Sequence, residues 1–215
     1  MRAVDADEGE RPAKGPGRPR DPSVEKAILR AALRRIISDG YSRVTIGDIA
    51  ADAGVTRPTV YRRWASKRDL VVAALDFSLQ EEREHNPVGR FEELPPAEAL
   101  KRALRHAFPS DRGMKAIGHV LMEAEQNPEL LDLVRRHAIE PRVRPFIDTL
   151  WRLRDEGFVR KDLDLDVIAD MMIGSYYSSY IRRDDSATHS TDEVVEAIWP
   201  LIGCSRQEAA AERHR

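Results

Sequence analysis

The stretch of residues 45–70, TIGDIAADAGVTRPTVYRRWASKRDL, decides the fold of this 215-residue chain. Thr45 and Asp48 form a capping-box pattern that predicts the start of a short helix. Gly54 predicts the end of that helix, because glycine readily takes the left-handed conformation found after a helix. Thr56 is then placed to cap a second helix. The stretch therefore predicts two short helices that meet at a tight turn.

The second helix of this pair is predicted to have one apolar face and one face suited to DNA. At about 3.6 residues per turn, Val60 and Trp64 share the inner face, and Arg62 lies at the centre of the opposite face. No acidic side chain lies on that outer face. Arginine can bond guanine through two atoms, and threonine and tyrosine can reach bases or phosphate. The pattern predicts a helix-turn-helix whose second helix enters the major groove, with Pro58, Thr59, Tyr61 and Arg63 completing the outer face and its margins.

Charge is distributed unevenly along the chain, whose formal net charge is −2. Residues 11–70 hold 14 basic and 6 acidic side chains, whereas residues 71–215 hold 20 basic and 27 acidic ones. Only 6 of the 35 basic residues are lysine, and arginine favours bidentate bonds to phosphate or guanine. A basic block attached to an acidic remainder favours a polyanion as the partner of that block. The alternative is a small helical core with a solvated basic face.

The first twenty residues contain almost nothing to bury, which predicts disorder. Within them, Arg18 and Arg20 flank a proline directly before the first helix. A stiff positive arm of this kind suits a minor groove, whose narrow A·T stretches attract arginine. The alternative is a solubilising tail. We therefore expect residues 1–20 to be a disordered basic arm.

Composition argues against several classes of protein. Hydrophobic residues make up 41% of the chain, but no run approaches the roughly 20 apolar residues of a membrane span. The N-terminus has no apolar segment typical of a signal peptide. The single cysteine, Cys204, excludes an intrachain disulfide and fits a reducing compartment. We therefore expect a cytoplasmic protein without membrane contact.

The sequence carries no motif typical of an enzyme or of a metal site. It has no phosphate loop, no nucleophile elbow and no HExxH segment. Asp162, Asp164 and Asp166 alternate as in a calcium loop, but the glycine and the closing glutamate of such a loop are absent. Asp166 is instead expected to cap the next helix. We expect no enzyme activity, no cofactor and no metal.

Start and stop signals divide the rest of the chain into helices. Asp21 with Pro22 starts the first helix. Pro141 and Pro145 should break or kink the long helical stretch 128–157, which we expect to form two pieces. The three-helix unit of residues 21–65 is too small to be very stable alone and should lean on the next helix. The later helices are expected at about 67–84, 97–108, 114–126, 128–139, 142–156, 167–183 and 191–203, the last of them capped by Thr191.

With these features in place, the chain resembles a TetR-family transcriptional regulator. Residues 45–70 match that family's signature closely, including the Thr59-Val60-Tyr61 core of the recognition helix, the aromatic Trp64 and the following Lys67. The run from Asn127 to Ile181 looks like one of the family's C-terminal regulatory domains. The resemblance extends over nearly the whole chain.

This resemblance implies an all-α fold of about nine helices. A helix-turn-helix domain would cover residues 21–68, and a ligand-binding and dimerisation domain would cover residues 69–215. In this family a longer polar residue is often found at the position of Gly47. As a DNA contact, Arg57 ranks below Arg62, because Arg57 projects nearer the packed side of its helix. The DNA-binding set implied in this way is Thr45, Thr56, Arg57, Pro58, Thr59, Tyr61, Arg62, Arg63 and Lys67, of which Thr45, Tyr61 and Lys67 would contact phosphate.

The resemblance also implies a homodimer and a small-molecule effector. The helices at about 166–183 and 191–203 would pair with their copies in a four-helix interface. Interface candidates are Gly174, Ser178, Val195, Ile198 and Ile202. Candidates for the wall of an effector cavity are Met114, Met122, Phe146, Trp151 and Tyr177, for each of which ordinary core packing is the alternative.

These inferences predict a homodimeric repressor that binds a palindromic operator in double-stranded DNA and leaves it when a small molecule enters the C-terminal bundle. The effector would favour a spacing of the two DNA-binding heads that no longer matches successive major grooves. The helix at about 67–84 would transmit the change, because it touches both domains. The alternative is a DNA-binding or architectural regulator without a ligand.

Overall fold

The computed structural model describes residues 21–85, 91–108, 118–123, 127–182 and 190–204. Within those ranges the chain is helical, and its β structure is limited to one isolated bridge. The predicted all-α fold is confirmed. No helix in the described part is long and apolar enough to cross a membrane.

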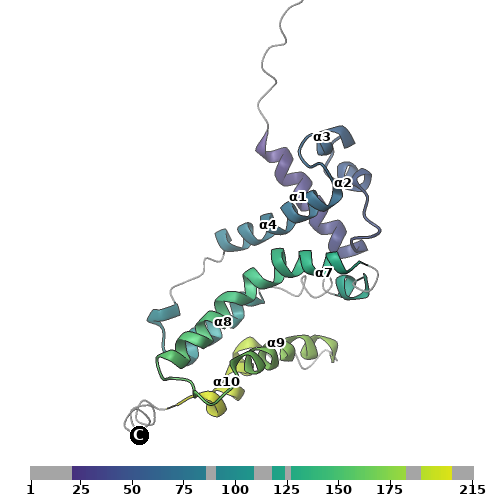
Figure 1. Cartoon of the computed structure of the whole chain (residues 1–215). Helices are drawn as coiled ribbons and strands as arrows, with labels where there is room; N and C mark the ends of the chain where they lie inside the picture. Colours follow the sequence, from purple (N-terminus) through teal and green to yellow (C-terminus); the bar gives the residue numbers. More distant parts are fainter. Residues whose placement is uncertain (1–20, 86–90, 109–117, 124–126, 183–189, 205–215) are drawn as a thin grey trace, which may run out of the picture.

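Figure 1 shows the helices in the order in which the chain forms them. The stretch 118–123, between α5 and α7, is also helical. The elements are α1 (Pro22–Asp39), α2 (Ile46–Asp52), α3 (Arg57–Tyr61), α4 (Lys67–His85), the 3-10 turn η1 (Phe91–Glu93), α5 (Pro96–Ala107), α7 (Pro128–Val134), the π-helical turn η2 (Arg135–Ile139), α8 (Glu140–Asp155), α9 (Leu165–Ile181) and α10 (Thr191–Ile202).

The start and stop signals of the N-terminal helices act as predicted. α1 begins after Asp21, whose carboxylate accepts a hydrogen bond from the backbone N–H of Ser23. α2 begins with the capping box of Thr45 and Asp48. After α2, Gly54 has φ of +66°, a left-handed conformation that costs glycine little. This glycine permits the tight turn between α2 and α3.

The first three helices pack on a common core that α4 completes, and we call α1 to α3 the head. Ile28 from α1, Ile49 from α2 and Val60 from α3 are fully buried in this core. Leu70 and Ala74 bring α4 into the same cluster. The prediction that a unit of this size leans on the next helix is confirmed, because α4 supplies part of the buried surface.

A second, smaller core joins the head to the C-terminal helices. Ile36 of α1 and Val71 of α4 are buried in one cluster with Val120 and with Leu130 and Leu133 of α7. α4 therefore contributes side chains both to the core of the head and to this junction.

The largest core lies among α5, α8, α9 and α10. Leu100, Phe146, Leu150, Met172 and Val195 are fully buried in it. These five side chains come from four different helices, so burial of apolar surface holds the C-terminal bundle together.

Backbone hydrogen bonds fasten the end of α10 to the segment after α8. The N–H of Arg160 donates to the carbonyl of Ile202 at 2.9 Å, and the N–H of Cys204 donates to the carbonyl of Phe158 at 2.9 Å. Cys204 is partly buried here. The last described residues are thus tied into the bundle.

The predicted break between residues 139 and 142 is wrong, because the chain continues through η2 into α8. The N–H of Glu140 donates to the carbonyl of Arg135, five residues back, which widens the helix just before Pro141. Pro141 then lies in the first turn of α8, where its missing N–H costs nothing. Pro145 lies inside α8 without ending it.

Two helix caps differ from the prediction by one or two residues. α9 is capped by Asp164, whose carboxylate accepts hydrogen bonds from the N–H groups of Asp166 and Val167, so Asp166 is not the cap. α10 is capped by Ser190 in a capping box, so Thr191 is the first helical residue. In each case several side chains in a row are good caps, and tertiary packing selects one of them.

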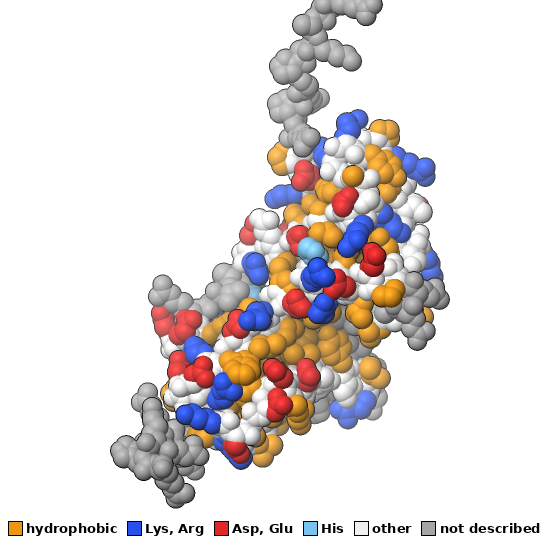
Figure 2. All heavy atoms as spheres, viewed as in Figure 1, with side chains coloured by type: hydrophobic (Ala, Val, Ile, Leu, Met, Phe, Trp, Pro, Cys, Tyr) orange, Lys and Arg blue, Asp and Glu red, His pale blue; other side chains and the backbone are white. Residues whose placement is uncertain are grey.

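The molecule is elongated, with α3 near one end and α10 near the other (Figure 1). α4 and α8 run through the middle. On the face shown in Figure 2, charged side chains of both signs cover much of the middle, and a band of apolar side chains lies between α8 and the α9–α10 pair. α3 and the last two helices, α9 and α10, therefore lie far apart within one chain.

Candidate nucleic-acid interface

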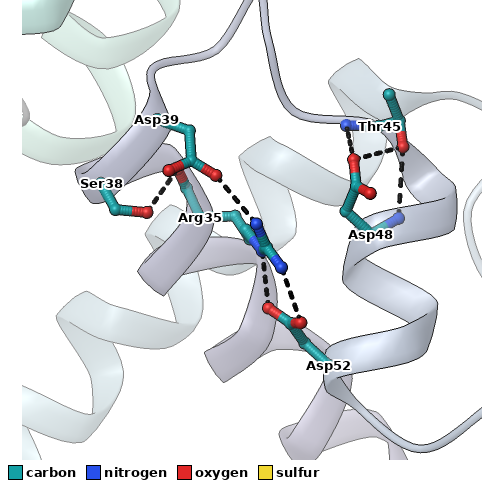
Figure 3. Close-up of polar contacts among 6 residues, drawn as sticks. All are labelled: Arg35, Ser38, Asp39, Thr45, Asp48 and Asp52. Atoms are coloured by element: carbon teal, nitrogen blue, oxygen red, sulfur yellow. Dashed lines mark hydrogen bonds and ion pairs between the residues drawn. The ribbon is translucent and has the colours of Figure 1, made fainter.

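A polar clamp fixes α2 against α1. The Arg35 guanidinium of α1 bonds the Asp52 carboxylate of α2 through two atoms, Nε to Oδ2 at 2.7 Å and Nη2 to Oδ1 at 2.8 Å (Figure 3). Its Nη1 also donates to Asp39 Oδ2 at 3.1 Å. The hydrogen bond from Arg35 lowers the pKa of Asp52, and hydrogen bonds from Ser38 and Arg35 lower the pKa of Asp39. The bidentate geometry sets the angle at which α2 leaves the head.

The capping box at the start of α2 is a second fixed point. Thr45 and Asp48 exchange backbone and side-chain hydrogen bonds, which Figure 3 shows beside the clamp. The bonds from Thr45 lower the pKa of Asp48. Thr45 remains exposed at the start of α2, so the described residues leave it accessible for its predicted contact with phosphate.

α3 presents the two faces that the helical wheel predicts. Val60 is fully buried and Trp64 is packed against the same core. Tyr61, Arg62 and Pro58 are exposed on the opposite side. The inner face of the recognition helix is therefore confirmed.

A short row of hydrogen-bonded side chains lies on the outer face of α3. Thr56 stands at the cap position, but its side chain makes no capping bond. Its hydroxyl instead lies 3.0 Å from the hydroxyl of Thr59, which also accepts from Nη2 of Arg62 at 3.0 Å. The Arg62 guanidinium is thereby held along α3, where it keeps further N–H groups for DNA.

The side chain of Arg63 points toward α1 instead of toward the solvent. Its side chain is only 12% exposed and its Nε lies 4.0 Å from the carboxylate of Glu25 in α1. Nη1 donates to the carbonyl of Thr59 at 3.1 Å. Sequence reasoning placed Arg63 at a margin of the outer face, but in this structure a base contact would require the side chain to leave the groove between α1 and α3.

Lys67 is also occupied within the chain. Its ammonium donates to the carbonyls of Tyr41 at 2.8 Å and Val44 at 3.0 Å and lies 4.3 Å from the centre of the Tyr41 ring. Burial lowers the pKa of Lys67. No local sequence signal indicates this role, because the two carbonyls belong to a turn more than twenty residues away. A lysine here locks that turn onto the start of α4.

Arg57 lies at the first position of α3 and is exposed. Its guanidinium rests against Gly47 of α2. Among the described residues, Arg57 makes no hydrogen bond and no ion pair, so its N–H groups are available to a partner. Arg18 and Arg20 of the predicted arm lie outside the described residues.

Of the five residues predicted to line an effector cavity, the four that the structure describes do not come together. Phe146 is fully buried in the C-terminal core, whereas Met122 is 80% exposed and Trp151 lies at the surface under the Arg154 guanidinium. Tyr177 is half-buried beside Phe108, and burial raises its pKa. Met114 lies outside the described residues. Met122 and Trp151 are therefore not part of an interior cavity of the single chain, because their helices turn them outward.

The predicted dimer residues fall into two groups. Val195 and Ile202 are buried in the core of their own chain, at 0% and 1% exposure, and cannot meet a second copy. Gly174 and Ser178 are exposed on α9, and Ile198 is half-buried. Val195 and Ile202 are buried because their side of α10 packs into the core that α10 shares with α5.

An exposed apolar stripe does run along α9. It consists of Val167, Met171, Gly174, Ser178 and Ile181, spaced alternately by four and three residues, which places them on one side of the helix. Met171 is 58% exposed and Ile181 is 79% exposed. Leu201 of α10 is also exposed. We call these five residues of α9 the α9 stripe.

Comparison with known proteins agrees with this arrangement. Residues 28–74 match the family described as Bacterial regulatory proteins, tetR family, and residues 97–198 match the Tetracyclin repressor-like, C-terminal domain. Over 148 residues the chain is 31% identical to a DNA-binding transcriptional repressor TetR from Mycobacteroides abscessus, covering 67% of this chain and 75% of the relative.

Solved structures share the fold at low sequence identity. The Flavonoid-responsive Regulator FrrA superposes with a TM-score of 0.63 at 20% identity, covering 84% of this chain and 95% of its own. A transcriptional regulator from Saccharomonospora viridis in complex with choline superposes with a TM-score of 0.60 at 21% identity, covering 86% of this chain and all of its own. The chain therefore belongs to the TetR family: it is a DNA-binding transcriptional regulator with a helix-turn-helix head.

Proposed function

We propose that this regulator is a homodimeric repressor that binds a palindromic operator and is released from it by a small organic molecule. It acts in the cytoplasm, where bacterial DNA lies. The observation that carries the proposal is the position of α4, which packs into the head and into the helices that follow.

The DNA face of the proposal is the exposed row on α3 together with Arg57. Arg62 and Arg57 supply guanidinium groups of the kind that bond guanine, and Thr59, Pro58 and Tyr61 lie beside them. Thr45 at the start of α2 is placed to contact phosphate, and Thr56 belongs to the same surface. Each chain would read one half-site, and two half-sites would lie about one helical turn of DNA, or a multiple, apart.

The second copy would pack against the α9 stripe. The stripe is apolar, lies on one side of a helix of 17 residues and includes Gly174 and Ser178, which let another helix approach closely. No atom of the described residues lies within 4 Å of a Cβ built on Gly174, so the described part of the chain leaves this space open. A second α9 with the same stripe is the partner whose shape fits it best, and the exposed Leu201 extends the apolar surface onto α10.

The coupling between effector and DNA would pass through α4. Leu70 and Ala74 are buried in the head, and Val71 is buried in the junction with α7. Farther along α4, Glu82 accepts two hydrogen bonds from the Arg142 guanidinium of α8, at 2.8 and 2.9 Å. A shift of α7 and α8 would therefore move α4 and, with it, the head.

The class of effector is proposed from the relatives and from the aromatic side chains. One structural relative is described as flavonoid-responsive and another was solved in complex with choline. Flavonoids and choline are both small organic molecules. In this chain Phe108 stacks on Tyr176 with ring centres 4.2 Å apart, and Tyr177 meets Phe108 edge-on at 6.1 Å. This cluster, between α5 and α9, is a suitable wall for a planar or cationic organic ligand.

Selection from a random duplex library tests the proposal. The full chain is incubated with the library at moderate and at higher salt, and bound DNA is sequenced. Enrichment of an inverted repeat that survives higher salt supports a dimeric sequence-specific regulator, because nonspecific phosphate binding weakens steeply with salt. Enrichment of a single half-site contradicts the dimer, and enrichment of nothing contradicts sequence-specific binding. Candidate effectors are then scored by the release of the selected DNA, and release by none of a broad panel favours a ligand-independent regulator.

A further inference from the structure

The backbone conformation at residue 47 does not require a glycine. It lies in the first turn of α2, and the glycines with positive φ in the described chain are Gly40, Gly54 and Gly157. Within a helix, glycine costs stability relative to alanine, because its backbone loses more freedom on folding. The absence of a side chain at residue 47 therefore serves something other than the local conformation.

The space beside Gly47 is filled by the side chain of Arg57. A Cβ built on Gly47 would lie 2.2 Å from Nη2, 2.6 Å from Nε and 2.8 Å from Cζ of that arginine. These are its three nearest heavy atoms, and all belong to the guanidinium. The guanidinium thus rests on the backbone of α2, in the position that a side chain at residue 47 would occupy.

Arg57 differs from the other cations near α3 in what it bonds. Within the described part of the chain, Arg62 is bonded to Thr59, Arg63 is buried against α1 and Lys67 is bonded to two carbonyls. Arg57 has van der Waals contact with Gly47 and keeps all of its N–H donors. The guanidinium is therefore held in position by packing, and its N–H groups make no hydrogen bond within the described part of the chain. A group that is positioned in this way loses little further freedom when it binds a ligand.

We propose that Gly47 is a positioning residue for Arg57 and that the two determine one base position of the operator together. Because residue 47 has no side chain, the Arg57 guanidinium lies across α2 and reaches DNA beside the recognition helix. Arg57 thereby supplies, from the start of α3, the contact that α2 cannot make. This inference rests on the proposed sequence-specific binding of DNA.

The same geometry allows the position of Arg57 to be changed without a change in the fold. The atoms that a methyl group at residue 47 would meet are the far end of a flexible side chain, so Arg57 can move aside without disturbing the fold. Gly47→Ala should therefore fold normally, with an unchanged or higher Tm. Gly118→Ala is the matched control, because it adds the same methyl group where no atom of the described chain lies within 4 Å.

The experiment is library selection with the wild-type chain, Gly47→Ala, Arg57→Ala, the double variant, Arg62→Ala and Gly118→Ala. Gly47→Ala and Arg57→Ala are expected to lose preference at the same base position of each half-site, by about 10-fold for Arg57→Ala. In the double variant Gly47→Ala should add nothing to Arg57→Ala. Arg62→Ala should act at a different position, and Gly118→Ala should change no position.

Each other outcome has a definite meaning. If Gly47→Ala leaves the preferred sequence unchanged, acts at another base, or adds its full effect to Arg57→Ala, the coupling is absent and the inference is overturned while the proposed function stands. If the wild-type chain enriches no sequence, the proposed function and this inference fall together.

Discussion

Glu123 accepts two hydrogen bonds from Ser42, one from its backbone N–H at 3.0 Å and one from its hydroxyl at 2.6 Å. Ser42 lies in the turn between α1 and α2, and Glu123 lies in the helical stretch 118–123. Gly40, two residues before Ser42, is buried against the same side chain: a Cβ built on Gly40 would lie 2.6 Å from Oε1 of Glu123. The head is therefore attached to the C-terminal helices at a second point besides α4.

Glu123→Ala should destabilise the chain by about 1–2 kcal/mol, because two charge-assisted hydrogen bonds are lost. Urea unfolding measures the loss, and hydrogen exchange at the Ser42 amide should become faster. Glu129→Ala is the control: Glu129 forms an exposed ion pair with Arg68 that should contribute about 0–1 kcal/mol. Equal losses in the two variants would contradict the role given to Glu123.

Lys67→Met should destabilise the head by about 1–3 kcal/mol, because the carbonyls of Tyr41 and Val44 lose a charged donor. The slope of log affinity against log salt should change little, since the ammonium is already bonded within the chain. Thermal unfolding and a salt titration of DNA binding check the two statements. A slope smaller by about one would show instead that Lys67 contacts a phosphate, as the family resemblance implies.

Arg62→Ala should weaken binding to the selected operator by about 1–3 kcal/mol and relax preference at one base position. The reason is the exposed guanidinium that Thr59 orients along α3. Binding to the operator and to single-base variants of it, measured by fluorescence anisotropy, checks this. An unchanged preference would show that the outer face of α3 is assigned wrongly.

Met171→Asp should convert the proposed dimer to monomer, because it places a charge in the middle of the α9 stripe. Met171 is mostly exposed in the single chain, so the monomer should remain folded. Light scattering after gel filtration gives the mass, and circular dichroism gives the helix content. Asp170→Asn is a neighbouring exposed control on the same helix that should leave the mass unchanged. A dimeric Met171→Asp variant would place the interface elsewhere.

Acid should destabilise the head through the Arg35 clamp. The folded-state pKa of Asp52 lies below its ordinary value of 3.8, chiefly because of the hydrogen bond from Arg35. A carboxylate with a lowered pKa contributes stability that is present above the ordinary pKa and is lost as pH falls through the folded-state pKa. Tm should therefore fall as pH drops below about 4.

Arg35→Gln isolates this contribution. The variant should have a lower Tm than the wild-type chain at pH near 7, and the difference should shrink as pH falls below about 4, because the lowered pKa values of Asp52 and Asp39 stabilise only the fold with the clamp. Parallel melting curves at every pH would contradict the clamp. Lys26→Gln, on the exposed side of α1, is the control, because Lys26 does not contribute to the lowered pKa of Asp52 or Asp39.

Local signals in the sequence predicted the head well. The capping box of Thr45 and Asp48, the glycine at 54 and the apolar pair Val60 and Trp64 act within a few residues of each other, so their spacing is sufficient to place α2 and α3. Pro141 does not end the helical stretch, because a proline is compatible with the first turn of a helix, and here it lies in the first turn of α8.

The facing of individual side chains depends on partners far away in the chain. Arg63 turns inward because Glu25 lies beside it, and Lys67 because the turn at Tyr41 presents carbonyls. Val195 is buried because α10 packs on α5. None of these partners is within one helical turn of the residue it orients, so no periodicity could reveal them.

The end of α10 has a practical consequence for labelling. Cys204 is the single cysteine of the chain, is partly exposed, and follows α10, the helix that lies at the end of the molecule opposite α3 (Figure 1). A maleimide dye would therefore attach at one position per chain and leave the recognition helix clear. By contrast, a dye on the first turn of α1 would lie near Arg63, because the Glu25 carboxylate in that turn is 4.0 Å from Nε of Arg63. Energy transfer from a donor on Cys204 to an acceptor on operator DNA would then report binding in real time.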